Sequence, residues 1–537
     1  MSGKAYTKIG KRGKEQNLTQ GQKGKEQVKN SDGAYVYAVD DKKRLDRFLI
    51  LGSEGGSYYA SEKKLTKENA KNIIKLIKED GIYVVNRVVE ISQDGRAPNN
   101  DPALFVLAMA SSLGDLDTRG LACDNLHKVA RTGTHLFHFI AYRETFSGWA
   151  RSLKRAVSNW YNKKPLDQLS YQILKYQSRD GWSHRDILRL AHVNPKRDEK
   201  RSCIYKWSTK REEVDQELLK TASPLLYAYE EITKTDNQKR VEELVKEYNM
   251  TLEMVPPDKR SKNIYQIMLK NYGLTALIRS LNVLTNKEIL SVSEIDNVND
   301  VCKRIVNSEA LKKERIHPYS LLLALKNYSA GHGFRGSLSW TPVRKIVDAL
   351  DEAFNLSFKT VEPTGKRLML GIDVSGSMSW GSINNSNINA AEAAAAMAMV
   401  AVRTEENVYC GAFCNSFTQL NISPKMNLDE ILKITRSLNF GSTDCGLPIR
   451  EALKNKLKVD SFIIYTDSET NNYNQKDPMI SLKEYRNKMG IDAKLVVVGM
   501  VSNGFTIADP NDSGCLDVVG FDSSTPQIIS EFNAGRI

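Results

Sequence analysis

The stretch GIDVSGSM places one aspartate and two serines at alternating positions, Asp373, Ser375 and Ser377, directly after a short apolar run. Such side chains can supply a serine nucleophile, hold a hard metal cation, or cap an ordinary polar turn. A serine hydrolase of the α/β class needs G-x-S-x-G and a histidine base. Here Asp373 stands two residues before Ser375, and all seven histidines lie upstream of the stretch. The sequence therefore disfavours a nucleophilic serine.

A metal site agrees better with these residues, because Mg²⁺ and similar hard cations bind oxygen ligands. Two later loops supply more oxygens: FGSTDCG carries Thr443 and Asp444, and YTDSET carries Asp467. A D-x-S-x-S motif alone is a weak signal, whereas five positions in three loops form a strong one. The competing interpretation is an aspartate that caps the next turn beside solvated serines. We predict one Mg²⁺ held, directly or through water, by Asp373, Ser375, Ser377, Thr443 and Asp467.

The elements that must position these loops follow from the periodicity. From about residue 360 onward, apolar strands alternate with helices, which predicts a doubly wound parallel α/β domain whose ligands sit at the carboxyl ends of the strands. Upstream, one short helix follows another; the segment TKENAKNIIKLIKEDG, for example, predicts a helix that stops at Asp-Gly. Stacked helix pairs of this kind resemble a solenoid. The predicted domains are a disordered basic tail at 1–30, a helical-repeat region at 31–358 and the α/β domain at 359–537.

Charge is unevenly distributed along the 537 residues. Residues 361–537 hold 16 Lys and Arg against 20 Asp and Glu, a net of −4, so the rest of the chain, with 61 against 44, carries +17. A basic excess favours phosphate-bearing partners, although a solvated lysine-rich surface is the plainer interpretation. Seven scattered cysteines indicate reduced thiols inside a cell. No apolar run is long enough to span a bilayer and no secretory signal is visible, so we expect a cytoplasmic protein without a membrane partner.

Two basic segments contain aromatic residues, a combination that suits RNA because cations neutralise phosphates and rings stack on unpaired bases. They are WARSLKRAVSNWYNKK and KYQSRDGWSHRDILRLAH. For Trp160 and Trp182, core packing is the stronger interpretation of each alone. His184 follows Ser183 before a helix, and helix N-termini accept phosphate, so we expect it to contact RNA rather than to be buried. Arg335 in GHGFRG is a weaker candidate. A cluster of charges on helices is most often a solvated face, and only the family resemblance given in the next paragraph favours RNA contacts here. The residues concerned are Arg151, Lys154, Arg155, Lys175, Arg179, His184 and Arg185.

Several long segments resemble the Ro ribonucleoprotein autoantigen family, in which a TROVE domain precedes a von Willebrand factor A domain. They include RFLILGSEGGSYY, GWSHRDILRLAH, IHPYSLLLALKNYSAGHGFRG, FKTVEPTGKRLMLGIDVSGSM and SNGFTIADP. The five predicted metal ligands match the metal-ion-dependent adhesion site (MIDAS) of the A domain in type and chain order. The resemblance runs from about residue 31 to the C-terminus.

The resemblance implies a ring of HEAT-like helical repeats closed by the A domain. It implies an RNA-binding protein, not an enzyme, that carries Y RNA on its outer surface and threads single-stranded 3′ ends of misfolded non-coding RNAs through a central hole for quality control. It further implies a monomer, cytoplasmic or also nuclear in a eukaryote, with an exoribonuclease or another protein at the metal site. The alternative is a metal-dependent protein-interaction scaffold without RNA. A nuclease is disfavoured, because the helical region shows no clustered carboxylates for two metals.

Overall fold

The computed structural model describes residues 27–29, 35–37, 41–52, 57–59, 65, 70–95, 97, 99–195, 197–333, 337–379, 383, 387–438, 443–467, 478–500, 508–509 and 512–537. The chain divides into two compact units. Unit 1 comprises Met1–Lys43, Gly55–Lys64 and Gly273–Ile537, and unit 2 comprises Arg44–Glu54 and Leu65–Tyr272. Within the predicted tail, only β1 (Gln27–Lys29) is described, and it pairs antiparallel with β2 (Tyr35–Tyr37). The other residues of that tail lie outside the described part of the chain.

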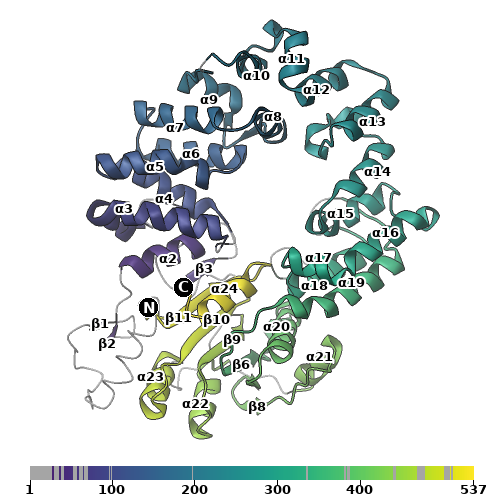
Figure 1. Cartoon of the computed structure of the whole chain (residues 1–537). Coiled ribbons are helices and arrows are strands. Elements are labelled where there is room, and N and C mark those ends of the chain that lie inside the picture. Colours follow the sequence, from purple (N-terminus) through teal and green to yellow (C-terminus); the bar gives the residue numbers. More distant parts are fainter. Residues whose placement is uncertain are drawn as a thin grey trace. The chain divides into compact units, whose positions relative to one another are not determined.

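Unit 2 is a stack of helices joined by short turns (Figure 1). Its helices are most of α2 (Asp41–Leu51), α3 (Lys71–Asp94), α4 (Asp101–Leu113), α5 (Leu116–Val129), α6 (Gly133–Phe146), α7 (Arg151–Asn162), α8 (Leu166–Lys175), α9 (His184–Ala191), α10 (Glu199–Thr209), α11 (Gln216–Ala222), α12 (Pro224–Lys234), α13 (Gln238–Glu247) and α14 (Lys262–Asn271). Neighbours pack in sequence order: α3 and α6 on α4, α5 on α7, and α7 on α9. Every residue of α4 from Pro102 to Ser111 is buried, as expected for a helix that is apolar on all sides.

The Asp-Gly pair predicted to stop a helix is a kink inside α3. Asp80 has the non-helical angles φ −148° and ψ 63°, and the helix then continues to Asp94. A Cβ atom on Gly81 would lie 2.3 Å from Oγ1 of Thr118 in α5. The glycine therefore lets two helices approach more closely than any other residue would allow.

The helical pattern continues in unit 1 and leads into a sheet. The helices before the sheet are α15 (Leu274–Asn286), α16 (Ile295–Ile305), α17 (Ser308–Lys313), α18 (Pro318–Ser329) and α19 (Arg344–Leu356), followed by the 3₁₀ turn η6 (Ser357–Thr360). α18 and α16 both pack on α19. The boundary predicted between residues 358 and 359 lies within unit 1, inside η6.

The sheet of unit 1 has seven strands in the order β3-β11-β10-β9-β6-β7-β8. These are β3 (Ser57–Tyr59), β6 (Leu368–Asp373), β7 (Val408–Phe413), β8 (Phe417–Gln419), β9 (Ser461–Thr466), β10 (Lys494–Gly499) and β11 (Cys515–Val519). All neighbours are parallel except β7 and β8. The helices of this domain are α20 (Ala390–Thr404), α21 (Leu428–Arg436), α22 (Leu447–Lys454), α23 (Pro478–Met489) and α24 (Thr525–Asn533). The predicted fold class, helical repeats followed by a doubly wound parallel α/β domain, is confirmed.

The central strands are buried throughout, because helices cover both faces of a parallel sheet. β6 and β9 are buried at all six of their positions. Their register pairs Ile372 with Tyr465, so the two strands end side by side. Among the helices that the structure describes, none is both long and apolar enough to cross a bilayer.

Candidate metal centre and nucleic-acid interface

Asp373 is the last residue of the central strand β6, so it lies at the carboxyl edge of the sheet. Only 1% of its surface is exposed. One carboxylate oxygen, Oδ1, accepts a hydrogen bond from the backbone N–H of Ser375 at 2.8 Å. The other, Oδ2, accepts one from the hydroxyl of Thr466 at the end of β9, also at 2.8 Å. The carboxylate is thus held in a fixed orientation by two adjacent strand ends.

The loop after β6 turns both serines toward the same region. It continues as the 3₁₀ turn η7 (Gly376–Ser379). The hydroxyl oxygens of Ser375 and Ser377 lie 3.1 Å apart, and Ser375 is buried. The alternating D-x-S-x-S spacing therefore brings Asp373, Ser375 and Ser377 together, as predicted.

The loop before α22 adds Thr443, which is 3% exposed. The backbone N–H of the next residue, Asp444, donates to the carbonyl of Cys414 at 3.0 Å, and this anchors the loop beside the end of β7. The Asp444 carboxylate forms an ion pair with Arg450 and accepts from the N–H of Gly446 at 3.0 Å. Asp444 is therefore occupied within the protein, which agrees with its omission from the predicted ligands.

Asp467 follows β9 directly and is 6% exposed. Two electrostatic effects show that it lies near Asp373. Burial raises the pKa of Asp373 to about 6, and the negative charge of Asp467 adds to that increase. Burial raises the pKa of the Cys445 thiol, and the negative charges of Asp373, Asp444 and Asp467 all add to that increase. The structure thus gathers residues of all three predicted loops at one edge of the sheet.

This set suits a hard divalent cation. Its donors are two carboxylates and three hydroxyls, and oxygen ligands are what Mg²⁺ prefers. Two neighbouring buried carboxylates repel one another, and a bound cation removes that repulsion. No group of three or more His, Cys, Asp or Glu side chains suited to a metal occurs among the described residues. The predicted site is of another kind, because hydroxyl groups provide three of its five donors.

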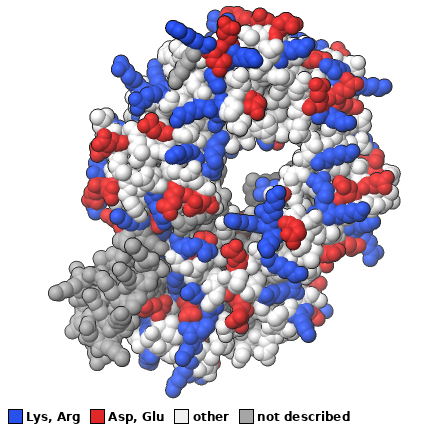
Figure 2. Space-filling model, viewed as in Figure 1, with Lys and Arg blue, Asp and Glu red and all other residues white. Residues whose placement is uncertain are grey.

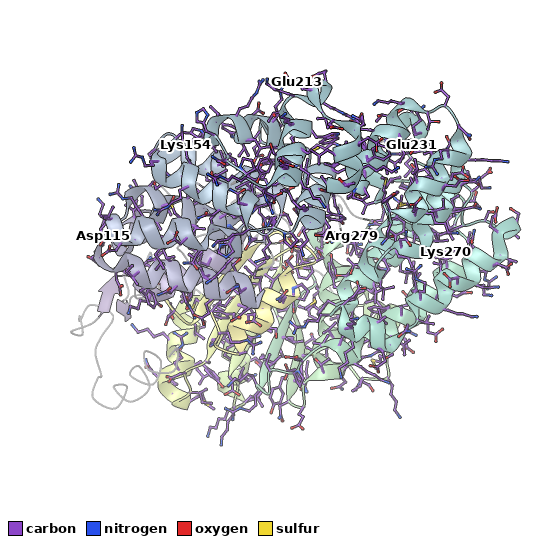
Figure 3. All side chains as sticks on the ribbon, turned by 45° about the horizontal axis from the view of Figure 1, so that its top comes forward. Asp115, Lys154, Glu213, Glu231, Lys270 and Arg279 are labelled. Atoms are coloured by element: carbon purple, nitrogen blue, oxygen red, sulfur yellow. The ribbon has the colours of Figure 1, made fainter. Side chains whose placement is uncertain are left out.

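In unit 2, four of the predicted RNA contacts are exposed arginines, and none is ion-paired to a residue that the structure describes: Arg151, Arg155, Arg179 and Arg185. Lys154 is half-buried on α7, where Figure 3 labels it. Lysine and arginine side chains lie on the surface over α7 and α9 in Figure 2. Unpaired exposed cations are available to phosphates, so this surface can bind a polyanion.

A hairpin carries Arg179 beside the start of α7. Its strands are β4 (Ser178–Arg179) and β5 (Trp182–Ser183), and its two turn residues, Asp180 and Gly181, have φ of 54° and 79°. The rings of Trp149 and Trp182 lie 5.8 Å apart. This contact brings the beginning of α7, and with it Arg151, next to the hairpin.

Lys175 is half-buried and turned toward tyrosines. Its Nζ donates to the hydroxyl of Tyr171 at 3.0 Å and lies 5.6 Å from the ring of Tyr176. Burial lowers the pKa of Lys175, but the Tyr171 hydrogen bond and neighbouring negative groups raise it more, so the pKa lies above its usual value. Lys175 therefore remains a cation, although a less accessible one than Arg179.

The expectation for His184 is wrong: its side chain is buried, with 3% exposed. Nδ1 lies 2.6 Å from the hydroxyl oxygen of Tyr161, and the ring packs edge-on against Phe137 at 4.8 Å. The start of α9 is already capped, because Ser183 and Asp186 form a capping box. His184 therefore joins α6, α7 and α9 and presents no ring to a phosphate. Trp160 is fully buried, in agreement with core packing.

Sequence reasoning missed several contacts that complete the two sites. Thr466, which binds Asp373, precedes the predicted Asp467 and could have been found as the last strand residue. Arg450, which neutralises Asp444, is the fourth residue of α22 and carried no motif signal. Trp149 was not distinguished from an ordinary aromatic residue. Arg335 lies outside the described residues.

Fold and site together define a class: proteins in which stacked helices precede a von Willebrand A-type domain. Family models match at both ends of the chain, the TROVE domain at 28–262 and the Ro60 vWA domain at 367–533. The RNA-binding protein RO60 of Deinococcus radiodurans is 39% identical over 517 residues, which cover 95% of this chain and 96% of that protein. The RNA-binding protein RO60 of Caenorhabditis elegans is 35% identical over 587 residues, covering 95% and 90%.

A solved structure agrees with these matches. The crystal structure of the Deinococcus radiodurans Ro (Rsr) protein has a TM-score of 0.86 and 37% identity, and the match covers 93% of this chain and 100% of that one. This chain belongs to the Ro60 family of TROVE proteins. The resemblance noted in the sequence is confirmed.

Proposed function

We propose that this chain is an RNA-binding protein that forms a small ribonucleoprotein. Its ligands are Y RNA and misfolded non-coding RNAs with single-stranded 3′ ends, and its role is RNA quality control. The observation that carries the proposal is the group of four exposed arginines without an ion pair among the described residues, on α7, β4 and α9. The relatives from two organisms, both described as RNA-binding proteins, support it.

Two modes of RNA binding are proposed. Structured RNA lies along the arginine surface of unit 2, which reads phosphates and helix shape rather than base sequence. A single-stranded 3′ end enters a central hole of the ring that the family resemblance implies, where only an unpaired strand passes. No catalytic step is part of the proposal.

The metal centre has a separate role in this proposal. Asp373, Ser375, Ser377, Thr443 and Asp467 hold one Mg²⁺, and the cation offers a remaining coordination position to a carboxylate of a protein partner, for example an exoribonuclease. The protein acts in the cytoplasm and does not associate with other copies of itself. The second candidate function, a protein-interaction scaffold without RNA, is supported by the same metal centre alone.

Two measurements on the purified protein separate the candidates. The first is the ratio of absorbance at 260 and 280 nm, followed by sequencing of any RNA that was crosslinked in cells; small structured RNAs are expected. The second compares a hairpin RNA with a single-stranded 3′ overhang to the same hairpin with a blunt end. Stronger binding of the overhang form is expected. Equal affinity across a salt titration would remove the threading mode, and absence of bound RNA would favour the scaffold.

A further inference from the structure

A cavity of about 1050 Å³ lies wholly within unit 1. Its wall is formed by α15, α18, the turn after α17, the segment after η6, and α24. Ligand pockets in proteins enclose roughly 300–1,000 Å³. The cavity therefore has the size of a small-molecule site, and it shares no residue with the arginine surface of unit 2.

Basic side chains without counter-ions line this cavity. Four exposed cations, Arg279, Lys312, Arg315 and Lys359, belong to its wall. None of the four forms an ion pair with a residue in the part of the chain that the structure describes.

Three carboxylates belong to the wall, and two of them are already occupied. The Glu314 carboxylate accepts hydrogen bonds from the backbone N–H groups of Leu274 and Thr275, each at 2.9 Å. Glu531 pairs with Arg536 at 2.7 Å. The third, Glu362, is exposed and forms no ion pair with a residue that the structure describes. Four unpaired cations against this one carboxylate leave the cavity with a net positive charge, which favours an anionic ligand.

Hydrogen bonds between the surrounding segments place these cations at one end of the cavity. The hydroxyl of Thr360 donates to the carbonyl of Ile316 at 2.9 Å, which brings Lys359 beside Arg315. Glu314, bound to the first residues of α15, holds the same turn against that helix. Arg279, labelled in Figure 3, lies about 6 Å further along α15 than Thr275. The cations thus gather near the N-terminal half of α15.

The other end of the cavity is apolar and aromatic. Tyr328 bonds Thr285, near the end of α15, through their hydroxyls at 2.8 Å. The indole N–H of Trp340 donates to the carbonyl of Tyr328 at 2.9 Å, and the two rings stack at 6.3 Å. Trp340 is half-buried, so part of its surface remains open to the cavity. Thr275 and Asn282 both line the cavity and lie about 10 Å apart along α15, so the wall is long enough to contact both the base and the phosphates of one nucleotide.

We propose that this cavity binds a nucleotide, with its phosphates on Arg279, Lys312, Arg315 and Lys359 and its base beside Trp340. The same chemistry is offered by a free nucleotide and by a short RNA segment. This site goes beyond the RNA-binding surface proposed for unit 2, and either can exist without the other.

Isothermal titration calorimetry of the full chain tests the proposal with two probes, ADP and a 5′-phosphorylated uridine trinucleotide. The variant Lys312→Ala/Arg315→Asn removes two exposed cations; asparagine is chosen because Arg315 has φ of 50°, a conformation that asparagine tolerates. Arg279→Ala is a second, independent variant. Lys313→Ala is the matched control, because Lys313 is exposed, adjacent to Lys312, and absent from the cavity wall.

Both cavity variants should lower the affinity for the probe that binds by at least tenfold, and Lys313→Ala should leave this affinity unchanged. Binding of ADP would identify free nucleotides as the source, and binding of the trinucleotide alone would identify an RNA strand; both results support the site. Absence of binding by both probes, or binding that neither variant weakens, would overturn it. If the arginine surface of unit 2 did not bind RNA, the results of these titrations would not change, because the variants alter only residues of unit 1.

Discussion

The hydroxyl oxygen of Tyr161 lies 2.6 Å from Nδ1 of His184, and this contact joins the last turn of α7 to the first residue of α9. Phe137 of α6 packs on the same imidazole. Arg179 and Arg185 flank this buried histidine in the chain. The interior contact therefore sets the positions of exposed cations on either side of it.

We expect the stability of unit 2 to fall between pH 6.5 and pH 4 because of His184. Burial lowers the pKa of His184 to about 4 in the folded protein, whereas an unfolded histidine titrates near 6.5. The contribution of the neutral, buried His184 to the free energy of unfolding is fully present above pH 6.5. It is lost as the pH falls, because the histidine binds a proton in the unfolded chain before it does so in the folded protein. The loss approaches about 3 kcal/mol at pH 4.

Urea unfolding at pH 7, 5.5 and 4.5 measures this effect. In His184→Gln, which keeps a polar group toward Tyr161 but does not titrate, the free energy of unfolding should vary less with pH. Burial also lowers the pKa of His135 in unit 2 and of His317 in unit 1 to about 4, so part of the pH dependence will remain. An identical pH profile for wild type and variant would contradict the prediction.

His184→Ala should lower both the melting temperature and the affinity for structured RNA, because it disturbs the packing of α6, α7 and α9. Truncation of a buried aromatic ring to alanine typically costs about 3–5 kcal/mol. Differential scanning calorimetry and filter binding on one preparation give both values. A variant that loses RNA binding at an unchanged melting temperature would show that the imidazole itself contacts RNA.

Asp373→Asn should abolish binding of Mn²⁺, measured by electron paramagnetic resonance, without lowering stability in EDTA. The folded protein raises the pKa of Asp373 to about 6, so the buried charge is unfavourable when no metal is bound. Asp460→Asn is the control, because Asp460 pairs with Arg367 before β6, at the opposite end of that strand. Unchanged Mn²⁺ binding in Asp373→Asn would place the metal elsewhere.

Gly81→Ala should destabilise unit 2 by about 1–3 kcal/mol, because the new Cβ atom meets Thr118 at 2.3 Å. Gly120→Ala is the matched control: it also lies within a helix of unit 2, and its Cβ atom meets nothing within 4 Å. The control should be neutral or stabilising by about 1 kcal/mol, since alanine favours helix. Equal effects in chemical denaturation would contradict the claim that Gly81 permits the close approach of α3 and α5.

Local patterns predicted what depends on neighbours in the chain. Strands buried on both faces read as apolar runs, so β6 and β9 were recognisable, and D-x-S-x-S marked the loop that gathers Asp373 and Ser375. Contacts between distant segments were not predictable in this way. β3 joins the sheet from residues 57–59, and His184 is buried only because α6 and α7 pack over it. The local sequence around a histidine at the start of a helix is the same whether its ring is buried or exposed, because tertiary packing decides the exposure.

The central claim, that the arginine surface of unit 2 binds RNA through phosphates, is tested most directly by the salt dependence of affinity. For a hairpin RNA, the slope of log affinity against log salt should become shallower by about 0.7–0.9 for each phosphate contact removed. Arg151→Ala/Arg155→Ala/Arg179→Ala should therefore flatten it by about 2–3, while Lys239→Ala/Lys246→Ala, exposed cations on α13, should leave it unchanged. A triple variant with the slope of the wild type would contradict the account.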